Sequence, residues 1–263
     1  SVVLVGIDQL SNRIIGRIGS PFVERPASAT TLAEVRTRLT NYPFLEPSDI
    51  PSYGRYGDES IALVIPVRSR FNNSFSGIVG YRPDGDRKGR ITGDLSIRLG
   101  NLFGSATTTE LNWNSKDERS QDLVFKEVIP FLGPFDSGAQ FGFSQSLQDG
   151  LFLRRQADVA LTSVFSRFGT LSAGISKTTT TATDLGVESG IEGYSTRSIT
   201  LRQELDRRNH SYLSTSGFSL DSRMDIGDLR SEDNKSKLLA MVSAKGELVK
   251  PITGPWSGSL TTS

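Results

Sequence analysis

Few residues of this chain combine the types and spacings that catalysis or metal binding would require. His210 is the only histidine and there is no cysteine, so a zinc site or a histidine-based triad would lack its other members. The stretch DGDRKG, from Asp84 to Gly89, has the opening of a calcium loop, but Lys88 occupies a ligand position and Leu95 replaces the required glutamate. Neither a G-x-S-x-G motif nor a glycine-rich phosphate loop occurs. We therefore predict that the chain is not an enzyme and has no cofactor or metal ion.

The balance of charges argues against nucleic acid as a partner. The chain has 30 Lys and Arg against 29 Asp and Glu, and its cationic residues are scattered without interleaved aromatic residues. No run of 18 apolar residues exists that would predict a transmembrane helix. A membrane location stays open, because the strands of a barrel need only about 9–11 alternating residues and have a low average hydropathy.

The first 70 residues have the pattern of a small α+β unit. A helix is predicted within 30–44, where Thr31 and Glu34 have the spacing of a capping box. Residues 11–22 predict a short helix or turn that leads into a loop, and residues 61–70 predict a strand. The order of strand, helices and strands is typical of a compact α+β domain.

From Asn73 onward the pattern changes to alternating strands and turns. Apolar and polar residues alternate with a period of two, as in strands that have one apolar and one polar face. The predicted strands lie at 73–82, 88–100, 105–114, 120–129, 137–147, 151–164, 169–178, 195–206, 212–224 and 235–250, with an eleventh starting near Ser257. We predict a mainly β chain with an antiparallel, up-and-down sheet.

The polar face of these strands is unusually rich in charge. Its charged members include Asp94, Arg98, Glu110, Asp158, Arg202 and Glu204. Packed soluble cores rarely bury so many charges, whereas a water-filled lumen accepts them. The pattern therefore predicts a transmembrane barrel in which residues such as Phe141 face lipid and residues such as Ser144 face the lumen.

The connections between strands also fall into two alternating sets. One set is charged or long, as in RPDGDRKG and NSKDERS, and the other is tight or apolar, as in GNLFG and PFLGPF. In an up-and-down sheet these sets lie at opposite ends of the strands. A barrel explains the difference, because apolar turn residues such as Leu102 and Phe103 would lie at the membrane–water boundary.

The order of these pieces resembles the BamA/TamA superfamily of outer-membrane proteins. The segment 75–144 is similar to the opening of that family's barrel, and the segments 13–22, 31–47 and 60–70 are similar to its last POTRA domain. In the family, the first strand ends in GY, here Gly80-Tyr81. The corresponding turn motifs here are Asn101, Leu102, Phe103 and Gly104 after the second strand and Pro130, Gly133 and Pro134 after the fourth.

The resemblance implies a POTRA-like periplasmic domain at 1–70 and an outer-membrane barrel at 71–263. The family barrel has sixteen strands and a later VRG-type loop motif, whereas about ten or eleven strands and no such motif are found here, so a truncated chain is expected. The implied function is insertion of barrel proteins into the outer membrane, or protein translocation across it. Outer-membrane lipid, unfolded client proteins and periplasmic accessory proteins are the expected partners, with no nucleic acid.

The resemblance also assigns a strand to the lateral seam, where the family's barrel is thought to open. By position, this strand consists of Asn73, Ser74, Phe75, Ser76, Gly77, Ile78, Val79, Gly80 and Tyr81. Gly77 and Gly80 would weaken it as a strand, which suits an edge that opens, although two glycines are common in any barrel strand.

Two other interpretations are compatible with the sequence. The barrel could anchor a passenger, such as a patatin-like lipase, or form a secretion pore for one partner. Alternatively, the chain could be a soluble all-β binding or structural protein whose turns happen to differ in polarity.

Overall fold

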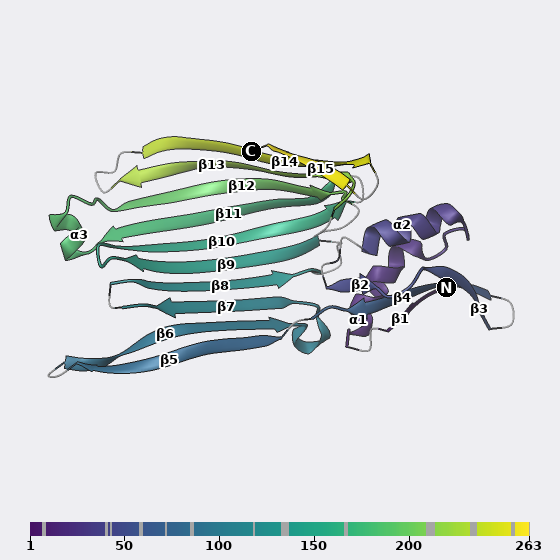
Figure 1. Ribbon diagram of the computed structural model, residues 1–263, viewed down its shortest axis with the longest axis horizontal. Helices are drawn as coiled ribbons and strands as arrows, with labels where there is room; N and C mark the ends of the chain where they lie inside the picture. The colour runs from purple at the N-terminus through teal and green to yellow at the C-terminus, as the bar shows by residue number, and fades with distance from the viewer. Residues whose placement is uncertain are drawn as a thin grey trace.

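The computed structural model describes most of the chain. The described residues are 1–6, 9–39, 42, 44–57, 60–71, 73–84, 87–117, 119–132, 137–165, 168–208, 214–231, 236–253 and 256–262. They form a small α+β unit, made by the first 69 residues, and one large antiparallel sheet (Figure 1).

The N-terminal unit is organised around one strand, β4 (Ser60–Ser69). β4 pairs in parallel with β1 (Val2–Val5) and antiparallel with β2 (Leu45–Pro47) and β3 (Ser52–Tyr56). The helices α1 (Asn12–Gly19) and α2 (Ala29–Leu39), with the 3-10 turn η1 (Ser20–Phe22), pack against this sheet. The alternating residues of β4 explain the arrangement, because Leu63, Ile65 and Val67 are buried against both helices.

The cap of α2 differs from the sequence prediction. The helix begins at Ala29, and the amide of Thr31 donates to the hydroxyl of Ser28 at 3.1 Å. Ser28 therefore occupies the capping position, and Glu34 pairs with Arg25 at 2.8 Å. The prediction of a Thr31–Glu34 capping box was wrong, because a better capping residue lies three positions earlier.

The large sheet contains eleven strands in sequence order. They are β5 (Ser74–Asp84), β6 (Arg87–Gly100), β7 (Thr108–Ser115), β8 (Gln121–Ile129), β9 (Ser137–Gln148), β10 (Phe152–Phe165), β11 (Gly169–Ala182), β12 (Tyr194–Asp206), β13 (Gly217–Ser231), β14 (Ser236–Thr253) and β15 (Trp256–Thr262). Each strand pairs antiparallel with the next, which confirms the predicted mainly β, up-and-down architecture. In the described part of the chain, β5 and β15 each pair on one side only.

Several boundaries in the sheet differ from the sequence prediction. β11 continues through the threonine run to Ala182 rather than ending at 178, because β-branched residues favour strand conformation. β13 begins at Gly217 and extends to Ser231, so part of the expected charged loop belongs to the strand. A five-residue helix, α3 (Asp184–Glu188), follows β11 and was not predicted.

One face of the sheet is apolar and solvent-exposed across five of its strands, β9 to β13. The ladder places Phe141, Val159, Ile175, Ile199 and Ile226 in one row across five strands. Each of these side chains is at least 40% exposed. A continuous apolar surface of this kind marks contact with a membrane or another protein.

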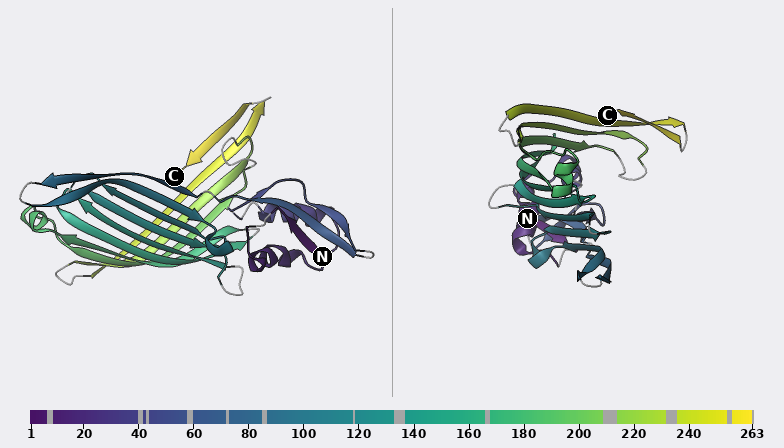
Figure 2. Two further views of the ribbon diagram at one scale, coloured as in Figure 1. Left: turned by 90° about the horizontal axis from the view of Figure 1, so that it is seen from below. Right: turned by 90° about the vertical axis from the view of Figure 1, so that its left-hand side faces the viewer.

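The N-terminal unit lies at one end of the strands, and α3 lies at the other (Figure 1). The turns β6–β7, β8–β9 and β10–β11 are at the domain end, whereas the predicted charged loops are at the end that carries α3. Figure 2 shows that the sheet is strongly curved, with β13 to β15 turned away from the strands that precede them.

The facing of β9 leads to a matched pair of substitutions. Phe141 lies in the exposed apolar row, whereas Ser144 lies on the opposite, polar face, with Gln156 as its register partner. We expect Phe141→Asp to block membrane insertion of the protein, because a charge in an apolar band costs on the order of a few kcal/mol. Ser144→Asp should insert normally. Heat-modifiable gel migration of membrane fractions measures both, and equal tolerance of the two substitutions would show that the faces are wrongly assigned.

Candidate functional site

The strand that the sequence assigned to a seam forms a free edge of the large sheet. β5 pairs with β6 from Ser74 opposite Arg98 to Asp84 opposite Arg87, with a register shift near its far end. Its other side has no partner strand in the described part of the chain. Phe75 and Ile78 lie on opposite faces of this edge and are 74% and 76% exposed. An apolar strand with unpaired backbone groups is a template for pairing with another chain.

The two glycines of β5 have different surroundings. A Cβ on Gly77 would lie 2.6 Å from the carbonyl oxygen of Asp94, closer than real Cβ contacts allow. At Gly80 the nearest atom would be 3.7 Å away, so a side chain fits there. Gly93 on β6 also requires glycine, since its φ is 143° and a Cβ would meet the carbonyl of Ile78 at 2.0 Å. Close approach of β5 and β6 therefore depends on Gly77 and Gly93, not on Gly80.

The start of β5 is attached to both the sheet and the N-terminal unit. The side-chain oxygen of Asn73 accepts a hydrogen bond from the amide of Gly100 at 2.6 Å. Two residues earlier, the ring of Phe71 stacks on Phe44 with centroids 6.1 Å apart and an interplanar angle of 4°. The domain end of the edge strand is thus fixed, while its far end is not held by comparable contacts among the described residues.

The predicted turn motif after β6 contacts the N-terminal unit. Asn101 donates from its side-chain amide to the carbonyl of Gln9 at 2.7 Å, and the amide of Ser11 donates to the carbonyl of Gly104 at 3.0 Å. The turn itself is the 3-10 segment η2 (Leu102–Gly104), and within it Phe103 adopts a φ of 56°. The side chain of Phe103 is 99% exposed. Its predicted position at a membrane–water boundary stays a prediction.

The second turn motif follows β8 and reaches the same junction. Pro130 directly follows β8, and the next residue, Phe131, packs against Tyr42 and Phe44 with ring centroids 5.6 and 6.1 Å apart. Gly133 and Pro134, which the sequence assigned to this motif, lie outside the described residues. Together with Phe71, these rings form an aromatic junction between the N-terminal unit, the segment before β5 and the turn after β8.

Ion pairs join neighbouring strands on the polar face. Arg202 on β12 lies 2.8 Å from Asp221 of β13 and also 2.6 Å from Glu204 of its own strand. Arg98 of β6 lies 3.3 Å from Glu110 of β7. The register places the predicted lumen residues Asp94, Arg98, Glu110, Asp158, Arg202 and Glu204 on this one face. Half-exposed pairs contribute about 0–1 kcal/mol each, so their main effect is to keep the face polar.

Arg208 extends this network beyond the end of β12. Its guanidinium lies 2.6 Å from Asp206 and 2.7 Å from Glu247 of β14. These contacts link the segment after β12 to β14, the second strand beyond it in the sheet. The hydrogen bond to Asp206 is the main reason that the pKa of Arg208 is raised above its usual range. This arginine stays charged at every physiological pH.

The described residues contain no group of three or more His, Cys, Asp or Glu residues that could hold a metal ion. His210 lies outside the described residues. Within the described ranges, no helix is long and apolar enough to span a membrane.

Comparison with known proteins gives matches among solved structures. No protein-family model and no curated protein matches the chain. Among solved structures, the chain is similar to BamA from Haemophilus ducreyi lacking POTRA domains 1–3, with 14% sequence identity and a TM-score of 0.50. The chain has a BamA-like fold. The likeness covers 96% of this chain and 51% of the BamA chain, so this chain spans about half the length of that BamA.

The BamA-like fold confirms the resemblance that the turn motifs indicated, at the level of architecture. Sequence reasoning missed the junction, namely Gln9, Ser11, Tyr42, Phe44, Phe71 and Phe131. The sequence holds one signal for this junction, because aromatic residues stand next to the ends of predicted elements. They lie in the segments YPF (42–44), RF (70–71) and PF (130–131). Their convergence could not be read from local patterns.

The glycine geometry yields a test on one strand. We expect Gly77→Val to weaken β5–β6 pairing by about 1–3 kcal/mol, because the side chain must push the strands apart. Gly80→Val is the matched control and should leave the pairing intact. Hydrogen exchange of the β5 amides in the folded protein measures the effect. Similar exchange rates in the two variants would mean that Gly77 does not set the strand spacing.

Proposed function

We propose that this chain belongs to an outer-membrane protein that inserts barrel proteins into the membrane or moves proteins across it. The large sheet would form the membrane-spanning part, with its apolar face toward lipid and its charged face toward a lumen. The exposed row that contains Phe141, Val159 and Ile175 supports this orientation, because such a surface is stable in a bilayer and costly in water.

The orientation across the membrane follows from the two ends of the sheet. The N-terminal unit would be a POTRA-like domain in the periplasm, and the turns next to it would lie at the periplasmic boundary. The connection that carries α3 and the loops beside it would then face the cell exterior. Phe103 and Leu132, exposed at the domain end, have the apolar character expected at a membrane interface.

The observation that carries the function is the free edge of β5. Alternate residues of β5 direct their backbone N–H and C=O groups away from β6, and no partner strand meets these groups among the described residues. The side chains of β5 are exposed on both faces. A client strand could pair with this edge by β-augmentation, so that its backbone groups are satisfied before it leaves water. This process needs no catalytic group. Periplasmic accessory proteins would bind the N-terminal unit.

The edge can be tested by disulfide trapping, since the protein has no cysteine of its own. Ser76 on β5 and Thr196 on β12 lie in one register row and on one face, but only Ser76 is on an edge strand. We expect Ser76→Cys to cross-link a cysteine-bearing C-terminal strand peptide of a barrel protein. Thr196→Cys should cross-link at background level, because its backbone is paired on both sides.

Folding is measured in the same samples. A band that shifts on boiling, seen only with detergent or lipid, reports the membrane-embedded sheet. Equal cross-linking at both positions in folded protein would reject β5 as the client-binding edge. A protein that folds in plain buffer would instead favour the soluble all-β alternative and reject the proposed location.

A further inference from the structure

Two cations stand within the apolar face of the sheet, toward the end that carries α3. Lys177 on β11 and Arg197 on β12 are register partners, and both side chains are exposed. On this face, Lys177 lies next to Ile175 and Arg197 lies next to Ile199, on the side toward α3. Among the described residues, neither cation forms an ion pair within 4.0 Å. The nearest acidic register partner, Asp228, is bound by Arg230 at 2.7 Å.

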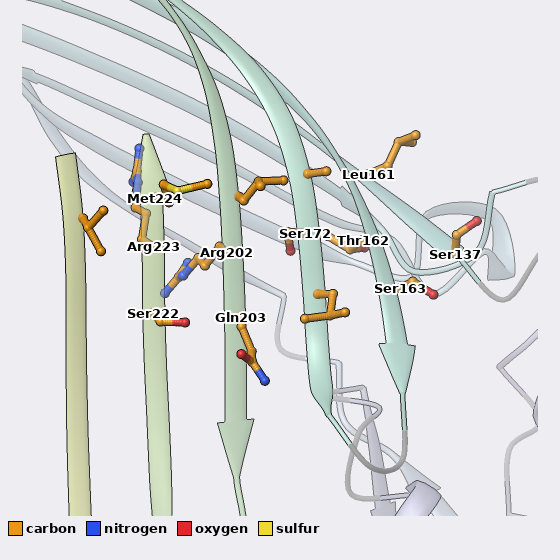
Figure 3. A pocket seen from close by; sticks show the side chains of 14 residues that line it. Ser137, Leu161, Thr162, Ser163, Ser172, Arg202, Gln203, Ser222, Arg223 and Met224 are labelled. Carbon is orange, nitrogen blue, oxygen red and sulfur yellow. The ribbon is translucent and has the colours of Figure 1, made fainter. Parts of the chain in front are cut away.

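The two cations lie at one end of an apolar groove. The groove has a volume of about 570 Å³, and Val159, Ile175, Ile199 and Ile226 provide its apolar lining. A second groove of about 640 Å³ occupies the next register row toward the domain end. It is lined by side chains of β9 to β14, including Leu161, Leu201 and Met224 (Figure 3). An apolar track with a cationic end has the shape and polarity of a site for a charged lipid.

Unpaired cations in a lipid-facing band require an explanation. A Lys or Arg near the bilayer interior is unfavourable unless its charge meets an anion or reaches the interface. Phosphate oxygens are strong acceptors for both side chains, and anionic lipid head groups gather around such clusters. Arg155 on β10 is a diagonal neighbour of Lys177, at about 7–8 Å by strand geometry. Its Nε donates to Gln145 at 2.9 Å, which orients it along the same surface.

We propose that this surface binds a phosphorylated glycolipid of the outer leaflet. One phosphate would lie between Lys177 and Arg197, a second would lie toward Arg155, and acyl chains would follow the two grooves. The inference rests on the proposed function, because that function turns the α3 end toward the cell exterior. Three cations spread over three strands suit a bisphosphorylated head group better than the single phosphate of a phospholipid.

The test compares two double variants with the same loss of charge. K177Q/R197Q removes the cations of the groove, whereas K126Q/R154Q removes two exposed cations from the polar face. The protein is reconstituted in phosphatidylcholine nanodiscs that contain equal amounts of lipid A and phosphatidylglycerol. Native mass spectrometry then counts the lipids that each protein retains. We expect preferential retention of lipid A, a loss of about tenfold in K177Q/R197Q and no change in K126Q/R154Q.

Four results would overturn the inference. Equal loss in both double variants would mean that retention follows net charge rather than this site. Equal retention of phosphatidylglycerol and lipid A would reject the glycolipid. Folded, heat-modifiable protein that retains no lipid A would reject the site while leaving the proposed function intact. A protein that does not become heat-modifiable in any lipid would reject both, so the two failures are distinguishable.

Discussion

The register of the antiparallel ladder is the constraint on which the large sheet depends. Side chains alternate between faces at every residue, so a slip of one residue in any strand would exchange its apolar and polar sides. From β6 to β13 the pairing is continuous, and register shifts occur only in the first pair, near Asp84, and in the last pair, near Pro251. The apolar row on one face and the ion pairs on the opposite face are both consequences of this constant register. Irregular pairing is confined to the pairs that include an edge strand.

The junction with the N-terminal unit requires unusual backbone as well as packing. Asn101, Phe103 and Ala106 all have positive φ values, of 59°, 56° and 58°. Such a conformation costs non-glycine residues about 1–2 kcal/mol each. Hydrogen bonds to Gln9 and Ser11, and burial of Ala106 in the N-terminal core, offset this cost. The turn and the N-terminal unit therefore support each other's local structure.

Period-two patterning made the number, order and facing of the strands predictable, because apolar and polar residues alternate along each strand according to the face they occupy. The end of β11 was misjudged because a run of threonines reads equally well as a loop. The cap of α2 was misjudged because Ser28 and Thr31 are both good capping residues, and only the helix start decides between them. The junction was not predictable, since Tyr42, Phe71 and Phe131 come from three separate segments. The roles of Gly77 and Gly80 likewise depend on atoms of the neighbouring strand.

The same contacts determine how the free edge can respond to the N-terminal unit. β5 begins three residues after Phe71, whose ring is stacked in the aromatic junction, and the side chain of Asn73 accepts a hydrogen bond from the amide of Gly100. Movement of the N-terminal unit would therefore act on the domain end of β5, where pairing is regular and Gly77 permits close approach. Separation of β5 from β6 is easiest at the opposite end, where the register shifts between Arg82 and Asp84. An edge anchored at one end and irregular at the other can fray without leaving the sheet. Under the proposed function, a client strand would find a partly unpaired template at this end.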